Sequence, residues 1–174
     1  HTATGKASAL PDSVTTFSEV LQSGGYYTKG YSNNPNIVGA FNYDQGFVDY
    51  VDLRPSLYFG AQPSCEKLVI YDILRKIVQK GNALMGGRIV ITDFYQPAET
   101  ITDSALAWID GPERPGAAPF LLFLHYMDPH DPFRDPERPG KGYARAQMPN
   151  PDPSMKDAFI RSYNYEIEYL DIHL

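Results

Sequence analysis

Residues 119–133 read PFLLFLHYMDPHDPF, and the first part of this stretch decides the fold. The run 120–127 is almost continuously apolar and has the length of a strand. An uninterrupted apolar strand is typical of a parallel sheet whose two faces are both covered by helices. We therefore predict an α/β chain in which this strand is buried on both faces.

Amphipathic segments on either side of the strand support the α/β prediction. Apolar residues at helical spacing predict helices at 11–23, 65–80, 97–110 and 154–174, the first of them capped by Asp12 or Ser13. A short strand is expected at 26–31, and RIVITDF at 88–94 is compatible with a strand or a helix. The residues expected to face the core are Val14, Phe17, Val20 and Leu21 in the first helix, Leu68, Ile70, Ile73, Leu74, Ile77 and Val78 in the second, Ile101, Ala105, Trp108 and Ile109 in the third, and Phe159, Tyr163, Ile167 and Leu170 in the last.

The bulk composition excludes several classes of protein. A length of 174 residues suits about one domain, and the net charge of −6 argues against a broad nucleic-acid-binding face. No apolar run approaches the roughly 18 residues that a membrane span needs. The first residues lack the basic and apolar pattern of a signal peptide. Because Cys65 is the only cysteine, neither an intrachain disulfide nor a cysteine-cluster metal site is expected.

Titratable side chains gather where the apolar run ends, at His125, Asp128, His130 and Asp131. In open α/β sheets, ligands bind at the carboxyl ends of the strands. The HxxxxH spacing is not one of the recognised zinc patterns, and two histidines alone do not complete a metal site. The residues by themselves leave two interpretations open: a turn after a core histidine, or a loop that presents His130 to a substrate.

Five segments, taken in order, resemble the sulfatase family of the alkaline-phosphatase-like superfamily. Residues 10–28 resemble LPxSxxTLAExLKxxGYxT, and residues 39–50 resemble its GFDxF region. Residues 95–110 resemble the helix before its central strand, and residues 119–133 resemble PFFLxLHxxxPHxPY. Residues 163–174 resemble YxxEIxYxDxxIG. The resemblance extends over nearly the whole chain and implies part of an alkaline-phosphatase-like core, with a mostly parallel sheet flanked by helices.

The resemblance also implies a chemistry. Sulfatases cleave sulfate monoesters with a formylglycine made in a [CS]xPSR motif, and a Ca²⁺ ion held by Asp, Asn or His side chains neutralises the sulfate oxygens. The chain contains no [CS]xPSR motif and lacks the family's metal-ligand segments. We therefore expect residues 1–174 to be a single partial domain, an internal portion of a larger catalytic domain. Its nucleophile and Ca²⁺ would be supplied from outside the chain, and no metal ligand is assigned within it.

Site residues follow from the matched motifs. His130 corresponds to the histidine of PHxPY and is expected to contact the sulfate or the leaving group, with His125 and Asp128 as supporting residues. Many sulfatases place the Lys and His of GKWHLG after GYxT. Here Asn33 and Asn36 fall near those positions and are expected to bind substrate, whereas Lys29 precedes them.

The partner implied by the family is a small-molecule or carbohydrate sulfate ester, with no nucleic acid and no transmembrane segment. The alternatives are a phosphate or phosphonate monoester hydrolase or a phospho-transferase of the same superfamily, or a non-catalytic fragment that acts as a binding module. The family is compatible with a periplasmic, extracellular or lysosome-like compartment, and no signal in the sequence chooses among them.

Overall fold

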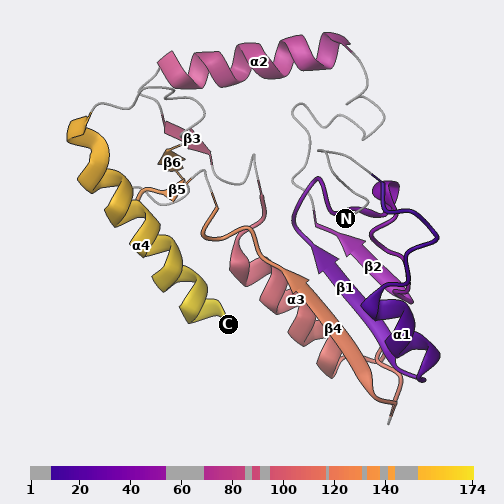
Figure 1. Ribbon diagram of the computed structural model, residues 1–174. Helices are drawn as coiled ribbons and strands as arrows, with labels where there is room; N and C mark the ends of the chain where they lie inside the picture. Colours follow the sequence, from indigo (N-terminus) through magenta and orange to yellow (C-terminus); the bar gives the residue numbers. More distant parts are fainter. Residues whose placement is uncertain are drawn as a thin grey trace. The chain divides into compact units, whose positions relative to one another are not determined.

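The chain folds into two compact units, each with its own sheet and helices. The computed structural model describes residues 9–53, 69–84, 88–90, 95–116, 118–130, 133–137, 141–143 and 153–174 (Figure 1). The first unit is formed by His1–Arg54 and Gln96–Met127, and the second by Pro55–Tyr95 and Asp128–Leu174.

Both units contain helices and strands. The first unit contains α1 (Phe17–Ser23), β1 (Tyr27–Ser32), the 3-10 turn η1 (Gly39–Phe41), β2 (Asp49–Asp52), α3 (Ala98–Asp110) and β4 (Phe120–His125). The second contains α2 (Val69–Leu84), β3 (Arg88–Val90), β5 (Phe133–Arg134), β6 (Lys141–Tyr143), the 3-10 turn η6 (Pro153–Met155) and α4 (Lys156–His173).

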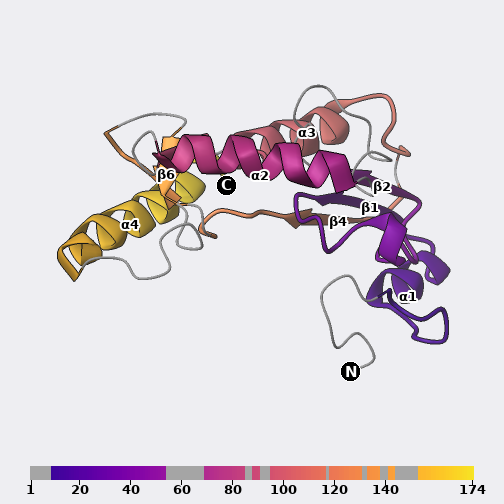
Figure 2. The same ribbon diagram turned by 90° about the horizontal axis from the view of Figure 1, so that it is seen from above.

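The sheet of the first unit is parallel, as the apolar run predicts. Its strand order is β2-β1-β4, and β1 pairs with β4 along its whole length. α3 and α1 lie on opposite sides of this sheet (Figure 2). The predicted α/β class, with a parallel sheet between helices, is therefore confirmed.

The core of the first unit lies between the sheet and α3. Tyr31 on β1 packs with Ile101, Ala105 and Trp108, which recur at helical spacing along α3 as the sequence predicts. Alternate residues of β4 contribute from the sheet: Phe120, Leu122 and Leu124 pack against this cluster.

The opposite face of β4 is more open than the sequence predicts. Phe123 points away from the α3 side and is 36% exposed. Within the described residues β4 pairs only with β1, so it is an edge strand of this three-stranded sheet. The expectation that β4 is buried on both faces is therefore wrong for the part of the sheet that the structure describes.

The first helix begins later than predicted because a capping box sets its start. The Thr16 hydroxyl accepts from the Glu19 amide at 3.1 Å, and the Glu19 carboxylate accepts from the Thr16 amide at 2.7 Å. Neither Asp12 nor Ser13 is the cap, and Phe17 and Val20, expected in the core, are 70% and 56% exposed.

The apolar stripes predicted for the second and last helices are also largely exposed. On α2, the expected core residues Ile70, Ile73, Leu74 and Ile77 are exposed, and the helix continues past Gly81. On α4, Tyr163 and Ile167 are exposed, and the buried residues are Ser162 and Glu166. For α2 and α4, the sequence pattern therefore predicts the presence of the helix correctly but assigns largely the wrong residues to its buried face. Leu68, assigned to the second helix, lies outside the described residues.

The second unit has a small antiparallel sheet in the order β3-β6-β5. The segment 88–94, left between strand and helix by the sequence, begins as β3, and residues 91–94 lie outside the described part. α4 packs against β5.

Close packing at Gly30 provides a test of the first unit. A Cβ at position 30 would lie 2.5 Å from Cδ2 of Tyr50, whose hydroxyl is tied to the Ile37 carbonyl at 3.0 Å. We expect Gly30→Ala to lower the free energy of unfolding by about 1–3 kcal/mol, because the ring has to shift.

Gly81→Ala is the matched control. A Cβ at position 81, inside α2, meets nothing within 4 Å, so this variant is expected to gain about 1 kcal/mol from helix propensity. Denaturant unfolding of both variants measures the difference, and equal effects would contradict the packing at Gly30.

Candidate functional site

Polar residues line the carboxyl edge of the parallel sheet. Ser32, the last residue of β1, lies opposite His125 on β4 and opposite Asp52 on β2. Three parallel strands thus end side by side in a hydroxyl, an imidazole and a carboxylate. Ligands bind at this edge in open α/β sheets, so the edge is a candidate for substrate contact.

Asn33 follows at this edge and is fully buried. Its amide nitrogen donates to the Gln96 carbonyl at 2.6 Å, and its oxygen accepts from the Gln96 amide at 2.8 Å. Asn33 therefore ties the end of β1 to the start of α3. Asn36 is exposed in the following turn, where its side-chain nitrogen lies 3.3 Å from the side-chain oxygen of Asn34.

Lys29 lies inside the first unit rather than in an open pocket. Its ammonium pairs with Asp49 and lies 5.0 Å from the centroid of the Tyr31 ring. Burial alone would lower the pKa of Lys29, but the hydrogen bond to Asp49 and the neighbouring acidic groups raise it overall. The lysine is thus a cation that β2 neutralises.

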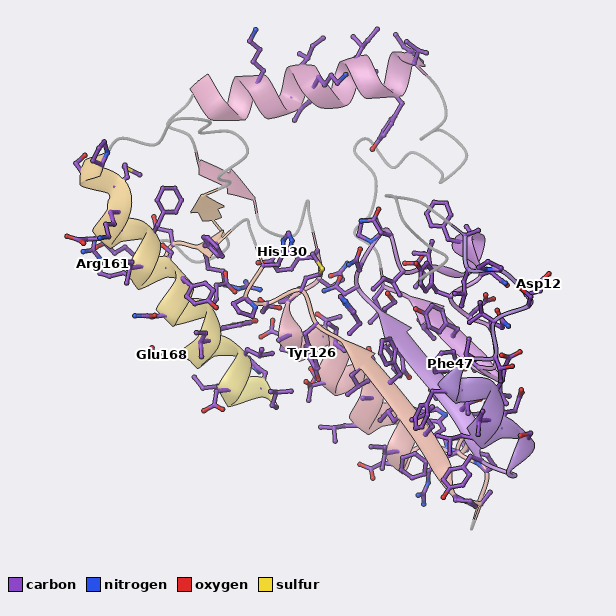
Figure 3. All side chains as sticks on the ribbon, in the orientation of Figure 1. Asp12, Phe47, Tyr126, His130, Arg161 and Glu168 are labelled. Carbon is purple, nitrogen blue, oxygen red and sulfur yellow. The ribbon has the colours of Figure 1, made fainter. Side chains whose placement is uncertain are left out.

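His130 belongs to the second unit, in the loop before β5 (Figure 3). Its side chain is exposed, whereas Asp128 two residues earlier is 4% exposed. The structure thus describes His130 and Asp128 in one unit and Asn33, Asn36 and His125 in the other.

Asp128 is part of a buried triad of charged residues. Nε and Nη2 of Arg134 donate to Oδ1 of Asp128 at 3.3 and 3.0 Å. Nε of Arg134 also lies 3.5 Å from Oε2 of Glu166 on α4, and the Arg134 amide donates to Oε1 of the same carboxyl. One arginine therefore joins the loop to α4 through both its side chain and its backbone.

Aromatic rings complete the surroundings of Arg134. Its guanidinium carbon lies 4.1 Å from the centroid of the Tyr169 ring and 5.9 Å from that of Tyr95. Tyr95 is fully buried. Rings on a guanidinium favour its charge and restrict its motion, so the fork that faces Asp128 is held in place.

Glu166 is the most perturbed acid of the site. Burial, opposed by the Arg134 amide and reinforced by a hydrogen bond with Asp128, raises the pKa of Glu166 to about 8. A carboxyl that keeps its proton near neutral pH donates a hydrogen bond instead of only accepting.

Neither Arg134 nor Glu166 was among the site residues predicted from the sequence. Glu166 falls in the predicted last helix, but the apolar stripe at Tyr163 and Ile167 pointed to another face. Glu166 shares a helix face with Ser162, at i and i+4, and the folded chain buries both. A charged residue on such a face is buried only with a partner, and that partner lies 32 residues away in the sequence.

The described residues do not form a calcium site. No group of three or more His, Cys, Asp or Glu side chains comes together among them, and the buried acidic pair Asp128 and Glu166 is occupied by Arg134. Ca²⁺ prefers six to eight oxygen ligands, so this pair does not fit the ion. Cys65 lies outside the described residues.

Comparison with protein families gives one result for the whole chain. A sequence model of the family described as Sulfatase matches residues 1–174. The chain belongs to the sulfatase family. No curated protein and no solved structure matches this sulfatase chain significantly.

Membership of the sulfatase family confirms the resemblance drawn from the five motifs, and it supports hydrolase chemistry in general. Sulfatases generally use a divalent metal, but this sulfatase chain shows no group for it among the described residues. In the same described ranges, none of its helices combines the length and the hydropathy of a membrane span.

Removal of the arginine tests the triad. Arg134→Met leaves Asp128 and Glu166 buried without their cation, so we expect the free energy of unfolding to fall by about 3–5 kcal/mol.

The matched control is Arg161→Met. Arg161 is exposed on α4 (Figure 3), so its loss is expected to change the same quantity by about 0.5 kcal/mol or less. Thermal or denaturant unfolding gives both values, and similar small losses in the two variants would refute the triad.

Proposed function

We propose that this chain is the internal portion of a sulfatase that hydrolyses sulfate monoesters of small molecules or carbohydrates. The observation that carries the proposal is the family match over residues 1–174. A formylglycine nucleophile and Ca²⁺ would come from parts of the protein outside this chain. The residues of this chain would bind the ester and manage its leaving group.

His130 is the residue that we propose for direct contact with the ester. It matches the histidine of the PHxPY motif, and its exposed side chain lies two residues after the buried Asp128. When the bond between sulfur and the ester oxygen breaks, that oxygen leaves with the electron pair and needs a proton. An imidazole can donate this proton, or donate a hydrogen bond to a sulfate oxygen.

The other proposed residues would bind the substrate or support the residues that do. Asn36 is exposed and has an amide that can meet a sulfate or sugar oxygen. Asn33 is buried, so its contribution would be to hold the turn that carries Asn36. His125, at the carboxyl edge of the sheet, and Asp128, at the start of the loop, would support the site from their own units.

The proposal is tested first by the choice of substrate. The full-length protein is expected to hydrolyse 4-nitrophenyl sulfate with a higher kcat/KM than 4-nitrophenyl phosphate, because the proposed substrate is a sulfate monoester. Release of nitrophenol measures both reactions. A preference for the phosphate would move the assignment to a phosphatase or phospho-transferase of the superfamily. Binding of sulfate without turnover of either ester would make the chain a binding module.

His130→Ala tests the role of the imidazole in the full-length protein. Loss of a general acid is expected to lower kcat by about 10²–10⁴-fold on an alkyl sulfate, whose leaving group needs a proton. The loss should be smaller on 4-nitrophenyl sulfate, whose leaving group departs readily without one.

Glu168→Ala is the control for His130→Ala, because Glu168 is exposed on α4 (Figure 3) and has no part in the proposed site. Its turnover and melting temperature should match those of the parent protein. If His130→Ala lowers the melting temperature but not kcat, His130 is a structural residue and the proposed role is wrong.

A further inference from the structure

The buried triad has unequal charges if all of its members are ionised. The side chains of Asp128 and Glu166 are 0% exposed, and that of Arg134 is 10% exposed. Two carboxylates against one guanidinium leave a net negative charge, and an unbalanced charge inside a protein is costly. One proton on the pair of carboxyl groups restores neutrality.

The hydrogen-bond pattern of the two carboxyl groups also indicates that one of them carries a proton. Oδ1 of Asp128 and Oε1 of Glu166 accept from Arg134, but no hydrogen-bond donor among the described residues reaches Oδ2 of Asp128 or Oε2 of Glu166. Both oxygens are buried, and the two carboxyl groups are within hydrogen-bonding reach of each other. A proton on one carboxyl group turns that group into a donor to the other, which supplies a hydrogen bond that the pair otherwise lacks.

Glu166 is the member of the pair that keeps the proton. Asp128 receives two hydrogen bonds from the guanidinium, at 3.3 and 3.0 Å, whereas the Glu166 carboxyl meets the same group at the longer distance of 3.5 Å. Burial acts in the same direction, since it raises the pKa of Glu166.

The triad fixes the loop that carries His130 at two points. Asp128 is held by the Arg134 side chain, and the Arg134 backbone is held by Glu166 on α4. His130 lies between these two points in the sequence and is itself exposed. Movement of either point would change where the imidazole can reach, and misplacement of a catalytic group by about 1 Å can cost about 100-fold in rate.

We propose that Glu166 and Arg134 are positioning residues for His130, and that a proton shared between Glu166 and Asp128 closes the triad and holds Asp128 and Arg134, on either side of His130 in the sequence, on α4. This rests on the role of His130 in the proposed function. The substrate itself does not touch the triad; the triad acts through the loop.

The proposal makes the loop sensitive to alkaline pH. The titratable groups that face the triad in the described part include Tyr95 and, from α4, Tyr169. Between the ordinary glutamate pKa of 4.5 and the raised value of about 8, the folded protein keeps a proton that the unfolded chain has released. The free energy of unfolding therefore falls as the pH rises through this window. Above the window Glu166 is ionised in both states, so it adds nothing further to the pH dependence.

Kinetics of the full-length protein test the positioning role. The side chain in Glu166→Gln cannot ionise but keeps a hydrogen-bond donor for Asp128. The side chain in Glu166→Ala cannot ionise and has no donor. We expect Glu166→Ala to lower kcat by about 10- to 100-fold with little change in KM, and Glu166→Gln to restore it. The parent should show a fall in kcat near pH 8 that Glu166→Gln lacks, because Glu166 loses its proton there. A decline that His130 causes as a general acid should be the same in all of these variants. Glu168→Gln, on the exposed face of α4, should behave as the parent.

The outcome that overturns the proposal is the same alkaline decline in Glu166→Gln as in the parent, or equal losses of kcat in the Gln and Ala variants while both remain folded. Either result would make Glu166 a structural residue without influence on His130.

Hydrogen exchange separates this proposal from the proposed function, because it needs no turnover. After correction for the intrinsic rate, the Arg134 amide of the parent should lose protection as the pH rises through about 8, and that of Glu166→Gln should keep it. Protection that does not change with pH in the parent refutes the shared proton. If the protection changes as expected but no sulfate ester is hydrolysed, the triad stands and the proposed function fails.

Discussion

The parallel pairing of β1 with β4 is the interaction on which the first unit depends. Residues 27–32 meet residues 120–125 in register, although half of the chain lies between them. This pairing brings Tyr31 to α3 and aligns Ser32 with His125 at one edge. Without it, neither the core against Trp108 nor the polar edge would exist, because neither segment can bury its apolar side chains alone.

The parts of the fold that sequence predicts are those fixed by local pattern. An unbroken apolar run gives β4, and apolar residues at 101, 105 and 108 give the buried face of α3. The buried faces of α1, α2 and α4 were predicted wrongly because a stripe of apolar residues does not say what it packs against. On α4 the partner is the arginine of β5, which selects Ser162 and Glu166 over Tyr163 and Ile167.

The candidate site likewise contains residues that the sequence suggests and residues that only the structure reveals. The residues after β4 make His130 a candidate, and only the resemblance to the sulfatase motifs selects it, so its role stays a prediction. Arg134 and Glu166 escape such an analysis, because their pairing joins segments that have no pattern in common. A glutamate in a helix is ordinarily solvated, and only the folded chain reveals that this one is enclosed with an aspartate and a cation.

The amide pair between Asn33 and Gln96 has a consequence for how the two positions tolerate change. Asn33 uses its side chain, whereas Gln96 uses only its backbone. Position 96 is therefore free to vary in sequence as long as it keeps an amide hydrogen, which excludes proline. Position 33 has no such freedom, because aspartate loses the donor and leucine loses both groups. Two residues joined by the same pair of hydrogen bonds thus differ sharply in how much substitution evolution or design can apply to them.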